Sequence, residues 1–412
     1  MRALLMPMGS HGDVLPLLGL GRALQETPGW QVKALISPVF ANAAAAAGLD
    51  YRLLGTIEDY DRAQQDPDLH NYRRGTQAVS RVLDNLLRLC YHELIQELDS
   101  SSEPTVLIGT TLAFPIRLAQ ELHGLPAVTV HLSPAVFRSN LRPPVLSPLG
   151  PLPRWLPPWF LKALWWLTDR LMLDPWLGGP YNRQRAELGL QPVRRVMGSW
   201  MHQVDLSLAL FPDWFFTPPA DWPAGLKQTG FPLWDIDSQS ELSPDLEQWL
   251  QKGDPPVVIT GGTAFAGRRK FYQECLAACA DLGRRALVVT RHHSNVPEGA
   301  CAVEYAPFSQ LLPRSAAIIH HGGIGTVAQA LACGTPQLVL PQAHDQFDNA
   351  HLVESLQAGL WCRRAGRLRH DLGKLLTSQC RRYPVGSGLP EAARAITSLA
   401  SLPPDSGCDE RR

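Results

Sequence analysis

An apolar run at residues 317–320 passes directly into a glycine-rich turn, and a helical pattern follows from Thr326 to Cys333. A strand, a tight turn and a helix in this order form part of a Rossmann-like unit. In such a unit the free N–H groups at the start of the helix and the positive end of its dipole point to one place. The sequence therefore predicts an α/β protein with an anion site at this turn, and a diphosphate is its natural occupant.

The turn itself is built from small and hydrogen-bonding residues. Glycines at 322, 323 and 325 let the backbone approach ligand oxygens closely, while His321 and Thr326 add side-chain donors. A tight turn alone would also explain the glycines. The pair His320 and His321, followed downstream by Asp345 and Gln346, favours the binding interpretation. No divalent metal is then required, and we expect neither a metal site nor a cofactor.

The same alternation of short apolar runs and helical patterns fills both halves of the 412-residue chain. Its length favours two domains. The pattern predicts an α/β architecture of two facing Rossmann-like domains with parallel sheets. The expected parts are an amino-terminal domain over 1–232, a linker over 233–245, a carboxyl-terminal domain over 246–385, and a terminal helix and tail over 386–412.

Charge and hydropathy exclude several classes of protein. The 38 basic and 38 acidic residues balance, so no basic surface for nucleic acid is expected. The first apolar run ends at Gly9, too early for a signal-peptide core, and no stretch reaches the roughly 18 apolar residues needed to cross a bilayer. We therefore expect a cytoplasmic protein.

Several motifs along the chain resemble those of the family 1 glycosyltransferases. They are Gly9-Ser10-His11-Gly12-Asp13, Tyr305-Ala306-Pro307, His321-Gly322-Gly323, Gly334-Thr335-Pro336 and Asp345-Gln346. The resemblance covers essentially the whole chain, and the rhamnosyltransferases of rhamnolipid synthesis and the bacterial sterol and polyketide glycosyltransferases are the most similar groups. It implies the GT-B fold, with the acceptor on the first domain and a nucleotide-sugar donor on the second.

The resemblance also implies a donor site. Its residues would be Thr263, Tyr305, His321, Gly322, Gly323, Gly325, Thr326, Gln329, Asp345 and Gln346. Tyr305 would stack on the base, and Asp345 and Gln346 would contact sugar hydroxyls. Gln329 stands where many UDP-sugar users have a glutamate that grips the ribose, which makes a thymidine donor more plausible.

The catalytic base is expected in the first loop. Asp13 occupies the position where the family places a base, and His11 is the competing candidate because the usual pKa of histidine suits proton abstraction. Asp13 also has the character of a helix N-cap before a helix over 16–25, and the two roles are compatible.

A Pro- and Trp-rich stretch over 143–180 interrupts the sheet pattern and predicts an amphipathic helix. Its aromatic stripe would either be buried in the first domain or line the acceptor site, with Trp159, Trp165 and Trp166 as acceptor-binding residues. Lys162 and Arg170 beside these rings also suit a peripheral contact with the inner face of a membrane.

The predicted function is inverting, metal-independent transfer of a hexose or deoxyhexose from a UDP- or dTDP-sugar to a hydroxyl of an apolar acceptor. A hydroxylated lipid is the preferred acceptor, and a sterol, hopanoid, carotenoid or polyketide is the alternative. A nucleotide-sugar 2-epimerase and a non-catalytic donor-binding subunit remain as alternatives of other classes. The acidic pair Asp235 and Asp237 is interpreted as part of the linker, not as a metal site.

Overall fold

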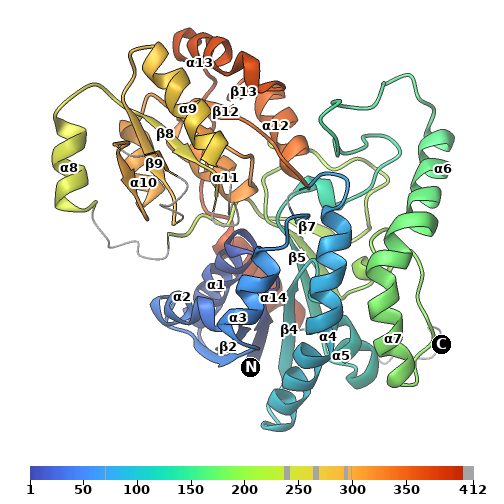
Figure 1. Cartoon of the computed structure of the whole chain (residues 1–412). Coiled ribbons are helices and arrows are strands. Elements are labelled where there is room, and N and C mark those ends of the chain that lie inside the picture. The colour runs from blue at the N-terminus through green and yellow to red at the C-terminus, as the bar shows by residue number, and fades with distance from the viewer. Residues whose placement is uncertain (70, 236–241, 263–268, 292–295, 298, 402–412) are drawn as a thin grey trace.

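Two α/β lobes, each built on one parallel sheet, make up the protein (Figure 1). The computed structural model describes residues 1–69, 71–235, 242–262, 269–291, 296–297 and 299–401. The first half of the chain forms the lower lobe of Figure 1 and the second half forms the upper lobe, as the alternation of apolar runs predicts.

The first lobe contains a seven-stranded parallel sheet in the order β3-β2-β1-β4-β5-β6-β7. Its strands are β1 Arg2–Met6, β2 Gln31–Ile36, β3 Asp50–Leu53, β4 Thr105–Thr110, β5 Ala127–His131, β6 Leu206–Ala209 and β7 Leu226–Gln228. Ala3 in β1 pairs with Val32 on one side and with Val106 on the other. The central strands are wholly buried, which explains why they are continuous apolar runs.

The second lobe contains a six-stranded parallel sheet in the order β10-β9-β8-β11-β12-β13. Its strands are β8 Val257–Thr260, β9 Ala286–Val289, β10 Ala302–Val303, β11 Ala317–His320, β12 Gln337–Val339 and β13 Gly359–Trp361. In both sheets the strand order reverses beside the first strand of the lobe, and ligands of such sheets bind at the carboxyl ends of the strands there.

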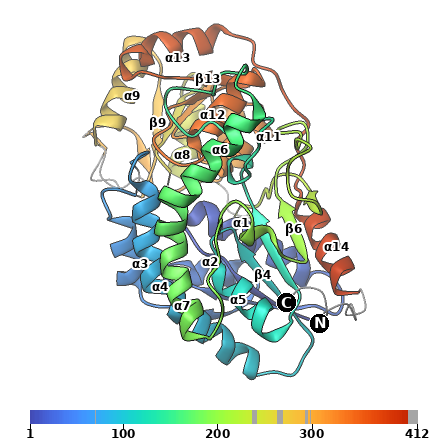
Figure 2. The same ribbon diagram turned by 90° about the vertical axis from the view of Figure 1, so that its right-hand side faces the viewer.

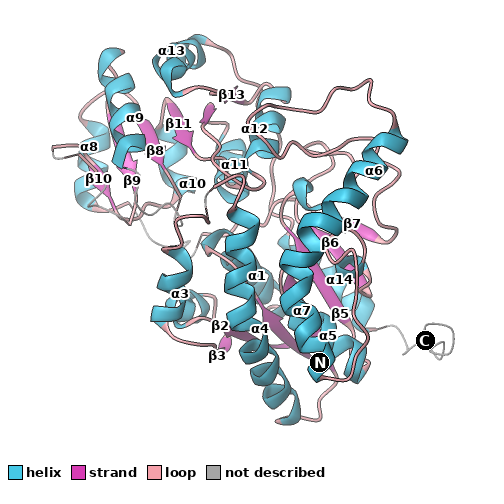
Figure 3. Cartoon of the chain, turned by 45° about the vertical axis from the view of Figure 1, so that its right-hand side comes forward, coloured by secondary structure: helices cyan, strands magenta, loops and turns pink. Residues whose placement is uncertain are grey.

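Helices cover both sheets (Figure 3). Those of the first lobe are α1 His11–Gln25, α2 Ala41–Ala46, α3 Ile57–Gln64, α4 Gly75–Asp99, α5 Phe114–His123, α6 Pro158–Thr168, the π-helix η3 Asp169–Gly178 and α7 Gly179–Glu187. Those that follow are α8 Pro244–Gln251, α9 Arg269–Asp281, α10 Phe308–Leu311, α11 Ile324–Cys333, α12 Gln346–Ser355, α13 Leu368–Thr377 and α14 Leu389–Ala400. The 3-10 helices are η1 Pro38–Phe40, η2 Pro134–Val136, η4 Trp200–His202, η6 Leu312–Arg314 and η7 Ala365–Arg367.

Two helices differ from the sequence prediction. Helix α1 begins at His11 and not at Pro16, because Ser10 is its N-cap and Asp13 completes a capping box. Pro16 lies inside the helix and does not start it. Helix α11 begins at Ile324, two residues earlier than expected, with Gly323 as its N-cap.

The last helix returns to the first lobe. Leu389, Ala392 and Ile396 of α14 are buried in the same apolar cluster as Leu5 of β1 and Leu17 of α1, and Figure 2 shows α14 beside the first sheet. Helix α14 thus belongs to the core of the first lobe, although it follows the second lobe in the sequence.

The two lobes also share packed and hydrogen-bonded contacts. Phe231 of the first half and Val327 of α11 belong to one apolar cluster. The Ser133 hydroxyl donates to Asn349 Oδ1 at 3.2 Å, and the Val145 N–H donates to Asp348 Oδ1 at 2.9 Å. These contacts fix the edges of the space between the sheets. No helix among the described residues is long and apolar enough to cross a membrane.

Candidate active site

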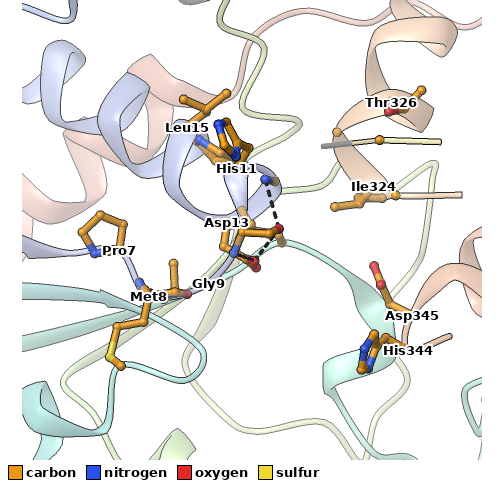
Figure 4. A pocket seen from close by; sticks show the side chains of 18 of the residues that line it. Pro7, Met8, Gly9, His11, Asp13, Leu15, Ile324, Thr326, His344 and Asp345 are labelled. Carbon is orange, nitrogen blue, oxygen red and sulfur yellow. Dashed lines mark hydrogen bonds between the residues drawn. The ribbon is translucent and has the colours of Figure 1, made fainter. Parts of the chain in front are cut away.

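A cavity of about 780 Å³ lies between the lobes, where the carboxyl ends of β1, β8 and β11 face one another. Figure 4 shows residues of the loop after β1 and the start of α1 on one side, and residues of α11 and the loop before α12 on the other. Both His11 and Asp13 line it, as do nearly all of the described donor residues that the sequence predicts. Gly322 is buried beneath the lining.

Asp13 reaches the cavity from the first turn of α1. The Ser10 N–H donates to Asp13 Oδ2 at 2.8 Å, and the Ser10 hydroxyl donates to the same oxygen at 3.1 Å. Burial raises the pKa of Asp13 to about 6, against the effect of these two hydrogen bonds, and the nearby carboxylate of Asp345 adds to the rise. The cap therefore holds a carboxylate whose proton affinity suits a general base near neutral pH.

His11 is buried and engaged on both ring nitrogens. Arg291 of the second lobe lies with Nη1 2.7 Å from His11 Nε2, and Tyr60 has its hydroxyl 3.2 Å from Nδ1. A guanidinium can only donate, so Nε2 is the acceptor and Nδ1 carries the hydrogen. Burial, followed by the charge of Arg291, lowers the pKa of His11 to about 4. Its lone pair is thus used in a contact between the lobes, which favours Asp13 over His11 as the base.

The turn after β11 is shaped by a buried histidine. The Gly322 N–H donates to His320 Nδ1 at 3.1 Å, so the hydrogen on Nε2 is directed to Gln337 Oε1 at 3.1 Å. Burial lowers the pKa of His320 to about 3, and the ring stays neutral. Gly322 has φ +96°, where a side chain would be strained and would also meet Val339. Of the histidine pair, His320 therefore has a structural role.

His321 is held in the cavity between two glycines. A Cβ on Gly262 would lie 2.4 Å from the imidazole, and one on Gly323 would lie 2.6 Å from it. Glycine at both positions therefore makes the space that the ring occupies. Gly323 caps α11, and Thr326 in its first turn also lines the cavity. Thus the helix terminus, His321 and Thr326 meet in one place suited to an anion.

Asp345 and Gln346 face the cavity from the start of α12. The Asn349 amide donates to Asp345 Oδ2 at 2.8 Å, and burial raises the pKa of Asp345. Gln346 Oε1 accepts from the Gln342 N–H at 2.8 Å. The amide NH₂ of Gln346 is therefore the group that can donate to a ligand hydroxyl. In Figure 4 Asp345 lies across the cavity from Asp13.

Asp235 was expected in the linker, but it lines the cavity beside Gln329. The Gln329 amide donates to Asp235 Oδ1 at 3.1 Å. A carboxylate therefore lies beside Gln329, although the residue at position 329 is itself an amide. Asp237 and the predicted phosphate ligand Thr263 lie outside the described residues. Tyr305 lines the same part of the cavity and is 45% exposed, in keeping with a surface for stacking.

The aromatic residues predicted to bind the acceptor are not in the cavity. Trp159 and Trp166 are 70% and 56% exposed on the outer side of α6, and the Trp165 Nε1–H donates to the Ser139 carbonyl at 3.2 Å. The structure places none of these three residues in the lining of the cavity, because α6 packs against the outside of the first lobe. The lining belongs instead to one face of α4, through residues such as Val79 and Leu86.

Four features of the cavity were not predicted from the sequence, namely α4, Tyr60, Arg291 and Asp235. For α4 a signal existed, since Val79, Leu83, Leu86 and Cys90 recur at helical spacing on one face of a 25-residue helix. Tyr60 reaches His11 through the packing of α3 inside the first lobe, whereas Arg291 and Asp235 meet partners that are distant in the sequence. No cluster of three metal-ligating side chains occurs in the part of the chain that the structure describes.

Comparisons with known proteins agree with this geometry. Residues 276–380 match a family described as "Erythromycin biosynthesis protein CIII-like, C-terminal domain". The O-mycaminosyltylonolide 6-deoxyallosyltransferase of Streptomyces fradiae is 29% identical over 359 residues, which cover 83% of this chain and 80% of that protein.

Solved structures share the architecture across the whole chain. The glycotransferase of kitacinnamycin superposes with a TM-score of 0.71 at 20% identity, covering 97% of this chain and 99% of that one. The glycosyltransferase SsfS6 of Streptomyces sp. SF2575, complexed with thymidine diphosphate, has a TM-score of 0.61 at 19% identity and covers 98% and 96%. The chain is thus similar in sequence to glycosyltransferases and shares the GT-B fold with solved glycosyltransferase structures.

Proposed function

We propose that the protein transfers a hexose or deoxyhexose from a UDP- or dTDP-sugar to a hydroxyl group of an apolar acceptor, with inversion and without a metal. One observation carries the proposal. A carboxylate whose pKa is about 6, that of Asp13, shares a cavity with the amino terminus of α11 and with the hydroxyl-binding side chains of the second lobe.

The donor diphosphate would bind at the start of α11. The N–H groups that follow Gly323, the Thr326 hydroxyl and the His321 ring are its hydrogen-bond donors, and the helix dipole offsets its charge. Asp345 and Gln346 are then placed for the sugar hydroxyls. The structure of SsfS6 with thymidine diphosphate supports a nucleotide ligand for this fold.

The acceptor hydroxyl would lie beside Asp13. Its oxygen forms a bond to the anomeric carbon while the bond from that carbon to the diphosphate oxygen breaks, and the diphosphate leaves with the electron pair. The hydroxyl proton passes to Asp13, whose Oδ2 can stay bonded to Ser10 while Oδ1 takes the proton. Stabilisation of the leaving diphosphate by fixed N–H groups supplies the electrostatic part of the catalysis.

The acceptor that fits the first lobe is apolar. The face of α4 contributes aliphatic side chains to the cavity, and Leu54 and Leu112 add to this wall. We propose a hydroxylated lipid as the acceptor. A polyketide is the second candidate, because the relative from Streptomyces fradiae acts on O-mycaminosyltylonolide.

The test has two stages, both with a chelator present. Calorimetry would compare UDP-glucose, dTDP-glucose and dTDP-rhamnose, and mass spectrometry would then seek a product one sugar heavier than a hydroxy fatty acyl acceptor. We expect binding of at least one donor and the corresponding gain in mass. Binding of none of the three donors, or binding only after metal is added, would contradict the proposal.

A further inference from the structure

Helix α6 and the π-helix η3 that follows it present a large apolar surface to solvent. More than half of the exposed large hydrophobic side chains of the described chain lie between Leu141 and Met172. The aromatic face is our name for seven of them, which are Trp155, Trp159, Phe160, Trp166, Leu167, Leu171 and Met172. A folded monomer seldom exposes so much contiguous apolar surface without a partner.

The other side of the same helix is firmly anchored. Leu161 is buried, and the Trp165 indole donates to the backbone of the first lobe. Asp169 is 2% exposed and forms an ion pair with Arg138 at 2.5 Å. The aromatic face is therefore the outward side of a fixed helix. Figure 2, in which α6 faces the viewer, shows that the helix lies at the surface of the molecule.

The exposed charged residues of the segment from Leu141 to Leu173 are all basic, and Asp174, which follows, is half-buried and accepts from the Arg195 and Val196 N–H groups. Arg154, Lys162 and Arg170 are exposed, and the Arg170 guanidinium lies 5.6 Å from the centre of the Trp166 ring. The buried Asp169 is the only acidic residue between Leu141 and Leu173 in the sequence. Cations that surround indole rings and aliphatic side chains match the interface of an anionic bilayer, where tryptophan prefers the headgroup level.

We infer that the aromatic face binds the surface of an anionic lipid bilayer. Apolar insertion and attraction of basic residues are the two signals that stable peripheral binding requires. A second copy of this chain fits less well, because two such faces would place their cations against each other. Leu146, in the loop that leads to α6, also lines the cavity. The inference thus deepens the proposed function, since a lipid acceptor could pass from the bilayer to the cavity.

Vesicle flotation of the full chain tests the inference without reference to catalysis. The vesicles would contain phosphatidylcholine alone, or phosphatidylcholine and phosphatidylglycerol in equal amounts. We expect binding to the anionic vesicles, weaker binding to the neutral ones, and loss of the difference when salt rises from about 0.1 to about 0.5 M. Removing two cations, in K162Q/R170Q, should weaken binding about twenty-fivefold, since each basic residue near such a surface contributes about fivefold.

A matched pair of double variants tests the apolar contribution. W159A/W166A should weaken binding to anionic vesicles at least tenfold, with an unchanged unfolding midpoint because both rings are exposed. The control L53A/L122A removes two large side chains that are 48% and 39% exposed elsewhere on the first lobe, and should bind as the wild type does.

Three outcomes would overturn the inference. They are absence of flotation with anionic vesicles, equal loss in the two double variants, and a vesicle-free dimer in sedimentation velocity that W159A/W166A dissociates. Calorimetry on the same variants measures donor binding independently of membrane binding. If the donor binds and the vesicles do not, the inference fails while the proposed function stands.

Discussion

Asp13 combines two roles that are usually separate. As the third residue of α1 it accepts two hydrogen bonds from Ser10 and completes a capping box, and as a partly buried carboxylate it faces the cavity. The cap fixes the direction of the side chain, and burial raises its pKa to about 6. The same contacts that start the helix thus orient the proposed base.

The D13N variant should lower kcat about a hundredfold to ten-thousandfold, the usual contribution of a positioned general base. Donor affinity should change little, because Asp13 lies across the cavity from the start of α11. Turnover kinetics and calorimetry measure the two effects. The D59N variant removes the equivalent carboxylate from the Thr56 capping box of α3, and thermal melting of both variants controls for loss of a cap. Near-normal turnover in D13N would return the role of base to His11.

The dependence of kcat/KM on pH should identify the base independently. A base acts when it is ionised, so protonation of Asp13 as the pH falls through about 6 should lower kcat/KM about tenfold for each further pH unit. His11, with a pKa of about 4, stays neutral over this range. A profile that stays flat down to pH 5 would exclude Asp13, and the H11Q variant should keep the wild-type midpoint.

Asp235 is a candidate for contact with the donor ribose, because it lines the cavity and is held by Gln329. The D235N variant should weaken UDP binding about tenfold or more, as expected for a lost hydrogen bond to a charged group. It should weaken dTDP binding less, since deoxyribose lacks one hydroxyl. Calorimetry with both nucleotides measures the ratio, and D245N, on the exposed first turn of α8, is the control. Equal losses for UDP and dTDP would contradict the assignment.

At the scale of elements, the amino-terminal ends of three helices supply most of the polar residues discussed for the cavity. Helix α1 positions Asp13, α11 begins at the proposed anion site, and α12 positions Asp345 and Gln346. Each of them follows the carboxyl end of a parallel strand, and parallel strands place all such ends on one edge. The long helix α4 adds the apolar wall.

The G325A variant tests the anion site without disturbing the fold. A Cβ on Gly325 would meet no protein atom within 4 Å, so alanine in α11 should leave stability unchanged or raise it by up to about 1 kcal/mol. The methyl group would occupy space at the lining of the cavity and should weaken donor binding at least tenfold.

The G373A variant, inside α13, is the matched control for this substitution. It adds the same methyl group to a helix at ordinary contact distance from Leu282 and should leave donor affinity unchanged. Urea unfolding and calorimetry compare the two variants. Wild-type donor affinity in G325A would place the diphosphate elsewhere.

At the scale of the whole molecule, segments from the two ends of the described chain pack together. Helix α14 comes from the end of the chain but packs in the core of the first lobe, and residues of both lobes share an apolar cluster around Phe231 and Val327. Arg291 and His11 add a polar contact across the cavity. The relative position of the lobes is therefore determined by contacts between segments hundreds of residues apart.

The I396A variant should therefore destabilise the first lobe, although residue 396 follows the second lobe in the sequence. Ile396 is completely buried, so the substitution should lower the free energy of unfolding by about 2–5 kcal/mol. Urea unfolding measures the loss, and hydrogen exchange should locate it in β1 and α1. The exposed neighbour variant S398A should change stability by less than about 0.5 kcal/mol. A similar small effect in I396A would show that α14 is not part of this core.

The local pattern of the sequence determined the fold class and many of the residues of the second lobe that line the cavity. Buried parallel strands are apolar on both faces, so β1, β8 and β11 could be predicted from local residues alone. An apolar run that is followed by glycines and a helical pattern is typical of a strand, a tight turn and a helix, so the turn at Gly322 and Gly323 could also be predicted. The same locality explains why His321, Asp345 and Gln346 could be expected to lie together.

Only the tertiary structure decided which side of each element meets the cavity. The aromatic stripe of α6 could equally have lined an acceptor site, but packing of Leu161 and Asp169 against the first lobe turns Trp159 and Trp166 outward. Asp235 and Arg291 likewise gain their partners from other parts of the chain. Periodicity shows that a helix has an apolar face, whereas the surroundings of that face depend on long-range packing that no short stretch of sequence contains.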